Sequence, residues 1–482
     1  MASVSHEHVV LEEHYHLDAK SKRNLFIFLG IGIALFVLGI FLLATDTGEG
    51  HGHEGAGHAV ESHAAAPDHG AVSHKEEVSS SEAHGAESHE EVKASSEEVA
   101  HGEGHHFHWI TRVWANLWLN GIFFTGLSII GLFFVSFNYV AFAGWSVVIK
   151  RVPEAFPAFL PFTFVVLLVV FFLGGHDLFH WTHTSLYQAG EHFDKILDSK
   201  KGFFFWPVTD PASIGIPYFF LGRMVLFFGL WMWIYSLIRK QSKLEDIHGG
   251  ESYFHKSTAL GATFLLVFGV SSVISAWDWV MSIDPHWFST MFGWYVFASW
   301  FVSGMATITL TVVLLKENGY LKLVNANHLH DLGKFMFGFS IFWTYIWFSQ
   351  FILIFYANIS EETVYFITRL YGYDGKYLPL FILNLFLNFF FPFIALMTRE
   401  AKRQLITLKI VSIVIIIGHY LDFYMMIMPG TLKEHSGFGP LEFGTILIFA
   451  TSFILVIANA LSKASLVAKN HPMLEESIHH NI

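Results

Sequence analysis

The feature that most constrains this chain is a series of ten long apolar runs. A helix needs about 20 mostly apolar residues to cross a bilayer, and each run is close to that length or longer. Lipid offers no partner for a backbone N–H or C=O group, which favours helices in such segments. The sequence therefore predicts an all-α integral membrane protein with about ten transmembrane helices. The runs are roughly 25–44, 115–142, 155–175, 217–238, 257–280, 288–315, 335–357, 378–397, 405–428 and 441–462.

Composition agrees with this class and excludes several functions. Only 14% of the residues are charged, against about 25% in a typical soluble protein. The chain has no Cys, which excludes disulfides, thiolate ligation of iron–sulfur clusters and covalent haem attachment by this chain. The basic residues are scattered between the apolar runs, so nothing indicates nucleic-acid binding.

The distribution of Lys and Arg predicts the orientation in the membrane. One set of connections holds 18 of the 28 basic residues and the opposite set holds nine. Cytoplasmic loops carry the excess of basic residues, so both termini are expected in the cytoplasm. The first run has a long polar segment before it and no cleavage site after it, so we interpret it as an uncleaved anchor. The predicted segments are a cytoplasmic segment 1–24, a first transmembrane helix 25–44, a periplasmic loop 45–109, a nine-helix membrane core 110–465 and a cytoplasmic tail 466–482.

The loop after the first run is rich in histidine. Residues 45–108 contain 12 His among many Gly, Ser and Glu. Their apolar content is too low to bury a core, so the loop is expected to be disordered or ordered only against a partner. Imidazole clusters bind Zn or Cu, but the spacing here is irregular. A metal-binding segment and a solvated low-complexity insertion both stay open.

Ionisable side chains within or beside the runs are the main functional signal. A charge at a helix centre costs about 2.5–3.5 kcal/mol on insertion scales, so such residues are functional candidates by default. Most of them fall in the outer half of the membrane, where they are expected to form one hydrated cluster. Arg223 is the expected counter-ion of Asp278 or Asp177. Proton handling, quinone contact and a structural ion pair stay open for this set: Asp177, Arg223, Asp278, His419 and Asp422.

Other polar and aromatic residues are expected to have structural roles. Asp284 followed by Pro285 predicts a helix start with Asp284 as the N-cap. Asn384 and Asn388 are expected to link helices through hydrogen bonds. The aromatic belt at the membrane interface is the expected place of four tryptophans: Trp277, Trp279, Trp287 and Trp294.

Three classes of function fit a chain of this kind. A subunit of a redox complex would bind quinone or conduct protons, and acids and imidazoles near the outer face would accept the two protons of a quinol. A haem b cytochrome with two haems needs four well-placed His, but the runs offer His419 and, at a helix end, His176 and His180. A secondary transporter often has broken helices near the midplane, and no such pair is evident in the sequence.

Three motifs carry a resemblance to a known family: HDLFHW at 176–181, WPVTDPASIGIPYFFLGR at 206–223 and SAWDWVMSIDPHWFSTMFGWY at 275–295. With these motifs the chain resembles the NrfD-like (polysulfide-reductase membrane subunit) family. Within that family it is most similar to the ActF-type subunit of bacterial alternative complex III. The similarity covers roughly residues 110–465 and leaves out the histidine-rich loop.

The resemblance implies a fold and an assembly. The fold would be two four-helix bundles, from the second to fifth and the sixth to ninth runs, plus two additional helices. The assembly would be a quinol:cytochrome c or other electron-acceptor oxidoreductase in the bacterial inner membrane. This chain would hold no cofactor of its own, although a bound quinone stays open. The implied partners are a sister NrfD-like subunit, an iron–sulfur protein, multihaem and monohaem c-type cytochromes carrying the haem c, lipids and an associated terminal oxidase.

The resemblance also implies roles for individual residues. The expected role of the ActF-type subunit is proton translocation. Carried onto this sequence, the candidate proton carriers are Asp177, Asp278, His419 and Asp422. His176 and Arg223 would tune them or form ion pairs. His180 and Gln350 are candidate quinone contacts.

Overall fold

The computed structural model describes residues 13–46, 108–208, 210, 213 and 215–481. The chain divides into two units, one of Met1–Ile40 with Ile110–Ile482 and one of Phe41–Trp109. Of the second unit only residues at its two ends are described, so nearly all of the histidine-rich loop, with its predicted disorder and metal binding, lies outside the described residues. The first unit contains every contact and site discussed below.

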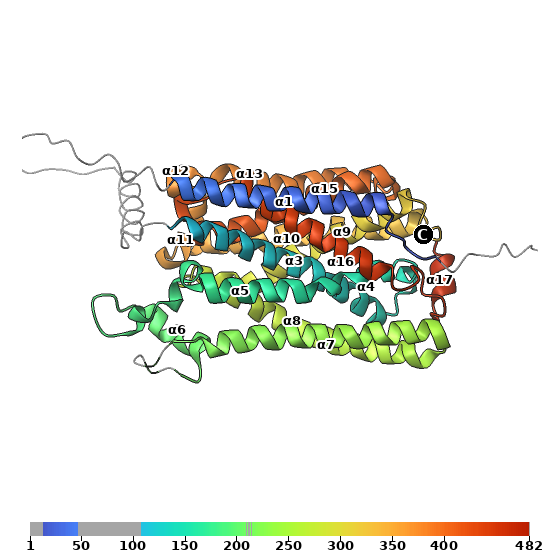
Figure 1. The fold of residues 1–482 in the computed structure, drawn as a ribbon, viewed down its shortest axis with the longest axis horizontal. Coiled ribbons are helices and arrows are strands. Elements are labelled where there is room, and N and C mark those ends of the chain that lie inside the picture. The colour runs from blue at the N-terminus through green and yellow to red at the C-terminus, as the bar shows by residue number, and fades with distance from the viewer. Residues whose placement is uncertain (1–12, 47–107, 209, 211–212, 214, 482) are drawn as a thin grey trace, which may run out of the picture. The chain divides into compact units, whose positions relative to one another are not determined.

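Ten helices of the described residues are long and apolar enough to cross a membrane, and these residues contain no β-strand. The prediction of an all-α, multi-pass membrane protein is therefore confirmed (Figure 1). The spanning helices are α1 (Ala19–Asp46), α3 (Trp109–Val140), α5 (Leu160–Leu178), α7 (Tyr218–His248), α8 (Glu251–Trp279), α9 (Phe292–Glu317), α10 (Ala326–Ala357), α13 (Leu378–Leu385) with α14 (Phe391–Ala395), α15 (Leu405–Thr431) and α16 (Pro440–Leu461). The short helices are α4 (Arg151–Ala155), α6 (Lys195–Phe205), α11 (Ser360–Leu370), α12 (Gly372–Gly375) and α17 (Leu474–Ile478).

Several helices are longer than the apolar runs, because polar residues outside the hydrocarbon continue the hydrogen-bonded helix. The run at 217–238 becomes α7, which continues to His248. It stops at Gly249, whose φ of 65° suits the left-handed conformation that favours glycine. The eighth spanning segment differs, because a π-helical turn at Phe386–Phe390 separates α13 from α14. Pro392 follows this turn, and proline has no N–H with which to continue the helical ladder.

Two four-helix bundles make up most of the first unit. In the first bundle, α3 packs on α5 where Gly121 faces Leu167, and α7 packs along α8. The second bundle consists of α9, α10, α13–α14 and α15, with α15 packed along α9 and α13. The bundles meet where α3 lies on α9: a Cβ on Gly126 would overlap the Trp300 ring. This arrangement agrees with the one that the family resemblance implies.

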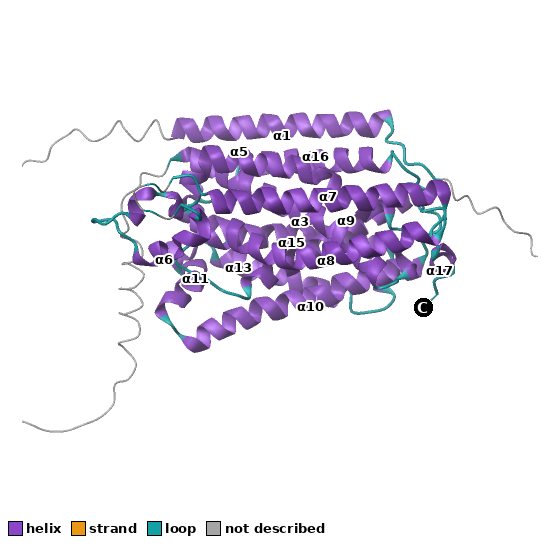
Figure 2. Cartoon of the chain, turned by 90° about the horizontal axis from the view of Figure 1, so that it is seen from below, coloured by secondary structure: helices purple, strands orange, loops and turns teal. Residues whose placement is uncertain are grey.

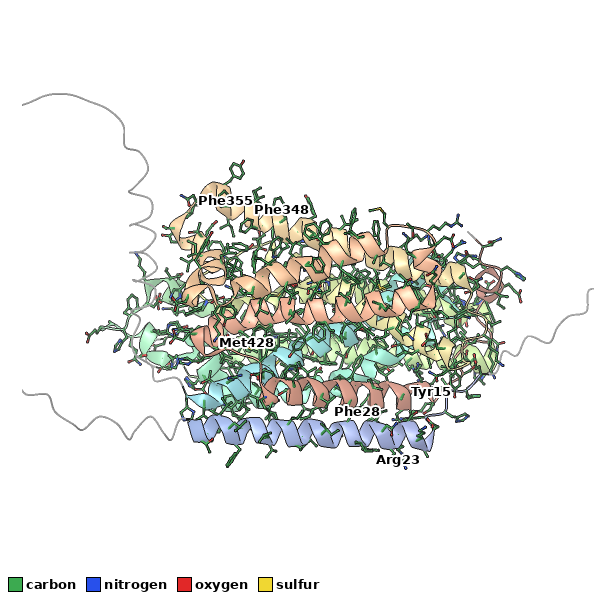
Figure 3. The ribbon with its side chains drawn as sticks, turned by 90° about the horizontal axis from the view of Figure 1, so that it is seen from above. Tyr15, Arg23, Phe28, Phe348, Phe355 and Met428 are labelled. Atoms are coloured by element: carbon green, nitrogen blue, oxygen red, sulfur yellow. The ribbon has the colours of Figure 1, made fainter. Side chains whose placement is uncertain are left out.

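Helices α1 and α16 are the two additional helices. They approach each other closely through glycine, because a Cβ on Gly39 would lie 2.5 Å from the backbone nitrogen of Leu441. The rest of α1 is largely exposed, and Figure 3 shows it, with Arg23 and Phe28, as an outermost helix. Phe348 and Phe355 likewise project outward from α10 (Figure 3). Exposed apolar faces of this kind suit contact with hydrocarbon.

The helices run between two ends of the bundles, which we name by their segments. The terminal end holds residues 13–18, 141–150, 318–325 and 465–481, where an antiparallel bridge joins His14 to Ser465. The distal end holds the segments around α6 and α11 (Figures 1 and 2). Both described ends of the chain therefore lie at the terminal end.

Candidate functional site

The first buried acid, Asp278, forms an ion pair with Arg223. Arg223 donates from Nε to Oδ2 at 2.7 Å and from Nη2 to Oδ1 at 2.6 Å, which is a bidentate pair. Nη2 also donates to the Phe203 carbonyl at 2.8 Å. Asp278 is fully buried and Arg223 is 7% exposed. Of the two partners that the sequence left open for Arg223, the structure therefore selects Asp278.

The second buried acid, Asp422, is held by neutral donors from three other helices. Trp343 on α10 donates to Oδ2 at 2.9 Å, and Asn384 on α13 donates to Oδ1 at 2.9 Å. The hydroxyl of Tyr295 on α9 also donates to Oδ1. Asn388 supports Asn384 through a 2.6 Å hydrogen bond. The expected hydrogen-bonding role of these two asparagines is present, and it serves the acid as well as the helix contact.

His419 lies beside Asp422 and is also fully buried. Its Nδ1 is 3.8 Å from Oδ2 of Asp422 and 3.0 Å from the hydroxyl of Ser299. Its Nε2 is buried and has no hydrogen-bond partner among the described residues. The imidazole therefore has one nitrogen in the acid's network and one nitrogen available to a water or a proton.

The candidate residues do not form the single cluster that the sequence analysis expected. Asp278 with Arg223 belongs to the first bundle, and Asp422 with His419 to the second. Among the described residues, the two groups have no hydrogen-bonding partner in common. The side chain of Asp177 is exposed at the distal end of α5 and makes no hydrogen bond or ion pair with any described residue. The expectation fails because depth along a helix does not fix which way a side chain points.

His176 and His180 belong to a row of imidazoles at the distal end. Ring centroids are separated by 5.1 Å for His176 and His183, 5.8 Å for His183 and His180, and 6.0 Å for His180 and His286. His286 forms an ion pair with Asp194, the N-cap of α6. Partial burial, together with His286 and His183, lowers the pKa of His180 to about 4. His180 is therefore neutral at physiological pH.

Gln350 lines a small cavity next to the Asp422 group. The cavity is about 20 Å³ and is also lined by Tyr295, Asn384 and Arg369. A cavity of that size holds about one water, so it is too small for a quinone ring. The Oε1 atom of Gln350 is buried without a hydrogen-bond partner among the described residues, which suits a bound water at this position.

Arg369 connects this cavity to the distal surface. Its guanidinium lies 3.4 Å from the centre of the Tyr365 ring and donates to the carbonyls of Met425 and Met426. It also donates to Asp284 at 3.0 Å. The predicted N-cap role of Asp284 is wrong, since α9 begins only at Phe292. The carboxylate of Asp284 instead accepts a hydrogen bond from the buried Arg369 of α11.

A row of hydroxyls runs along α9 from the Asp422 group toward the terminal end. The residues follow a spacing of four, which places them on one face of a helix: Tyr295, Ser299, Ser303, Thr307 and Thr311. The hydroxyls of Ser303, Thr307 and Thr311 each donate to the carbonyl four residues earlier, so their oxygens can still accept. Five hydroxyls over 16 residues cover about 24 Å.

The predicted position at the membrane interface is found for only some of the four tryptophans. Trp294 is 52% exposed, as an interfacial residue should be. Trp279 is fully buried and stacks on Phe228. Trp287 is buried against Tyr365, with ring centroids 3.9 Å apart. Both are core residues: Trp279 faces α7 from the end of α8, and Trp287 lies in the segment between α8 and α9, which packs on α11.

A repeated sequence pattern shows that the two buried acids occupy equivalent positions in the two bundles. The pattern Asp-x-x-Met-x-Ile-x-Pro begins at Asp278 and again at Asp422. Each acid lies on the fourth helix of its bundle and accepts a hydrogen bond from the third, from Arg223 on α7 or Asn384 on α13. The other donors to Asp422, Tyr295 and Trp343, come from separate helices, and no local pattern marks them.

No protein-family model and no curated protein matches this chain.

Proposed function

We propose that this chain is an integral membrane subunit of a quinol-oxidising respiratory complex of the alternative complex III type, in which it takes part in proton translocation. The proposal places the chain in a bacterial inner membrane with both termini in the cytoplasm. The observation that carries it is the fully buried His419–Asp422 pair, held by neutral donors in the membrane interior.

The two acids support different chemistry. A guanidinium does not give up its proton in proteins, so Arg223 remains a cation hydrogen-bonded to both oxygens of Asp278. Asp422 has no Lys or Arg within ion-pair distance among the described residues, and the nearest imidazole is that of His419 at 3.8 Å. An acid and an imidazole can exchange a proton between them. We therefore assign the proton-carrying role to His419 and Asp422, and a structural role to Asp278 and Arg223.

Routes toward both ends support this assignment. Toward the distal end, the cavity beside Gln350 leads to Arg369 and Asp284. Toward the terminal end, the hydroxyl face of α9 extends to Thr311. Side chains four residues apart have Cβ atoms about 5–6 Å apart, which is longer than a hydrogen bond. Waters must therefore link successive hydroxyls.

The same assignment fits a division of labour with partner subunits. Oxidation of a quinol releases two protons as well as two electrons. The electrons would pass to the iron–sulfur clusters and haem c of partner proteins, and this chain would carry protons. A quinone contact at His180 would place the ring at the distal surface, since the cavity at Gln350 is too small for it.

The test uses the complex purified through a tag on this chain and reconstituted in liposomes. We expect it to copurify with an iron–sulfur protein and c-type cytochromes, and to oxidise quinol with proton release. Asp422→Asn keeps the side-chain shape and cannot carry a proton, so it should lower the number of protons moved per electron by at least half. The control is Ser257→Ala, a substitution at a buried residue near the start of α8. It should leave the number of protons moved per electron unchanged.

Two results would overturn the proposal. Purification of the chain without any redox partner would remove the assignment to a respiratory complex. A wild-type proton-to-electron ratio in Asp422→Asn, with normal quinol turnover, would remove the proton-carrying role while leaving membership of the complex intact.

A further inference from the structure

A large apolar groove lies on the surface between the two bundles. It has a volume of about 1060 Å³ and lies between α8 and α10, which both pack on α9. Figure 2 shows α10 at the lower edge of the molecule, with α8 above it. The groove is separate from both acids and from the cavity at Gln350, which have other lining residues.

The groove is lined by aromatic rings and kept open by glycine. Phe133, Phe268 and Phe297 form its floor, with ring centroids 5.5 Å from Phe133 to each of the other two. Gly269 stands on the α8 wall and Gly338 on the α10 wall. A Cβ on either glycine would meet no atom within 4 Å. A larger side chain at either position would project into the groove without disturbing the packing behind it.

The groove has one polar end. At the terminal end, Asp331 is ion-paired with Lys334 and with His480, the latter at 2.7 Å. The side chain of Lys334 is half exposed. Toward the distal end the lining finishes at Trp294 on the first turn of α9. The groove thus runs from a polar end, where Lys334 is paired with Asp331, into the hydrocarbon region.

The lining favours lipid chains over a helix. The α10 wall alone, from Asp331 to Phe342, extends for about 16 Å. Phe335, Phe339 and Phe342 stand along this wall. Hydrocarbon chains are thinner and flexible, and they fill an irregular aromatic channel without leaving backbone groups unpaired.

We propose that the groove binds a glycerophospholipid, with its acyl chains against the aromatic floor and its phosphate beside Lys334. Basic residues between transmembrane helices bind lipid phosphate in this way. The lipid fills the gap between α8 and α10 and so joins the two bundles from the outside. This inference is independent of the proton-carrying role of Asp422.

The test counts lipids on the full chain. The protein is extracted in mild detergent, washed extensively and examined by native mass spectrometry, with phospholipid phosphorus measured in parallel. We expect at least one retained phospholipid per wild-type chain and at least a fivefold reduction in Gly338→Leu. Gly269→Leu, on the opposite wall, should behave in the same way. Gly229→Leu, on α7 and also facing open space, should retain the wild-type amount.

The head-group contact is tested at Lys334. Lys334→Ala should lower phospholipid retention at least threefold, and Lys334→Arg should restore it. Equal retention in wild type and both leucine variants would overturn the proposal. The proposal would also be overturned if the wild-type chain retained an isoprenoid lipid in place of phospholipid. It would be overturned as well if the leucine variants lost a bound second copy of the chain while retaining the same amount of lipid.

Discussion

At the scale of single residues, the partner of a buried carboxylate decides what that carboxylate can do. Asp278 and Asp422 occupy the same place in a repeated pattern and are both fully buried. Asp278 accepts two hydrogen bonds from the guanidinium of Arg223. Asp422 accepts hydrogen bonds from the indole of Trp343, the amide of Asn384 and the phenol of Tyr295. The first carboxylate is paired with a cation, and the second is held by neutral donors beside the imidazole of His419.

The ion pair leads to a prediction about stability. Arg223→Leu removes the only cation paired with Asp278 among the described residues and leaves a buried charge. Breaking a buried pair on one side costs about 3–5 kcal/mol, so the variant should assemble poorly and lose stability in detergent. Thermal unfolding followed by circular dichroism measures the loss.

The matched control removes both charges. Arg223→Leu with Asp278→Leu leaves no unpaired charge, and replacing a buried pair by apolar groups is often close to neutral. The double variant should recover most of the lost stability. If the single variant is as stable as wild type, the pair has no structural role.

At the scale of elements, we expect the distal segment 179–194 to respond to protonation of histidine. Its short 3-10 turns are held by few hydrogen bonds, such as that from the Asp194 amide to the Leu186 carbonyl. Inside it, His180 lies between the imidazoles of His183 and His286. The charged groups that act on His180 besides these imidazoles are Asp194 and Lys433. Protonating His180 would add a charge to a crowded, partly buried row.

The prediction concerns pH. The pKa of His180 is lowered to about 4 in the folded chain, against about 6.5 for an unperturbed histidine. The stability contributed by the neutral ring is fully present above pH ~6.5 and is lost as the pH falls toward 4. Residues 179–194 should therefore exchange amide hydrogens faster at pH 5 than at pH 7, after correction for intrinsic rates.

His180→Gln provides the control, because glutamine does not titrate. The pH dependence of exchange in 179–194 should be clearly smaller in this variant. An identical pH response in wild type and His180→Gln would show that another group is responsible.

At the scale of the whole molecule, the helices were predicted well because apolar length is a local property. Ten runs of sufficient length gave ten spanning helices, since lipid leaves the backbone few alternatives. The interruption at Phe386–Phe390 and the extension of α7 to His248 were not predicted. The hydropathy of a segment does not show where the helical hydrogen-bond pattern changes to a π-turn, or how far a helix continues beyond the membrane.

The joint between the bundles gives a prediction at this scale. A Cβ on Gly126 of α3 would lie 1.8 Å from Cδ1 of Trp300 on α9, so a larger side chain has to push the bundles apart. Gly126→Leu should lose about 1–3 kcal/mol or more, as overpacking does, and lower the thermal midpoint. The same substitution at Gly229, which faces open space, should leave the midpoint unchanged. Equal midpoints for the two variants would contradict this joint.

The sequence by itself determined the class of this protein, its ten spans and the residues that are costly to place in lipid, because each depends on composition within one segment. Only the tertiary structure decided that Arg223 pairs with Asp278, that Asp422 is surrounded by Tyr295, Trp343 and Asn384, and that Asp177 is left outside. These pairings join helices far apart in the chain. They are set by the packing of glycine and aromatic side chains between helices, which no single segment specifies.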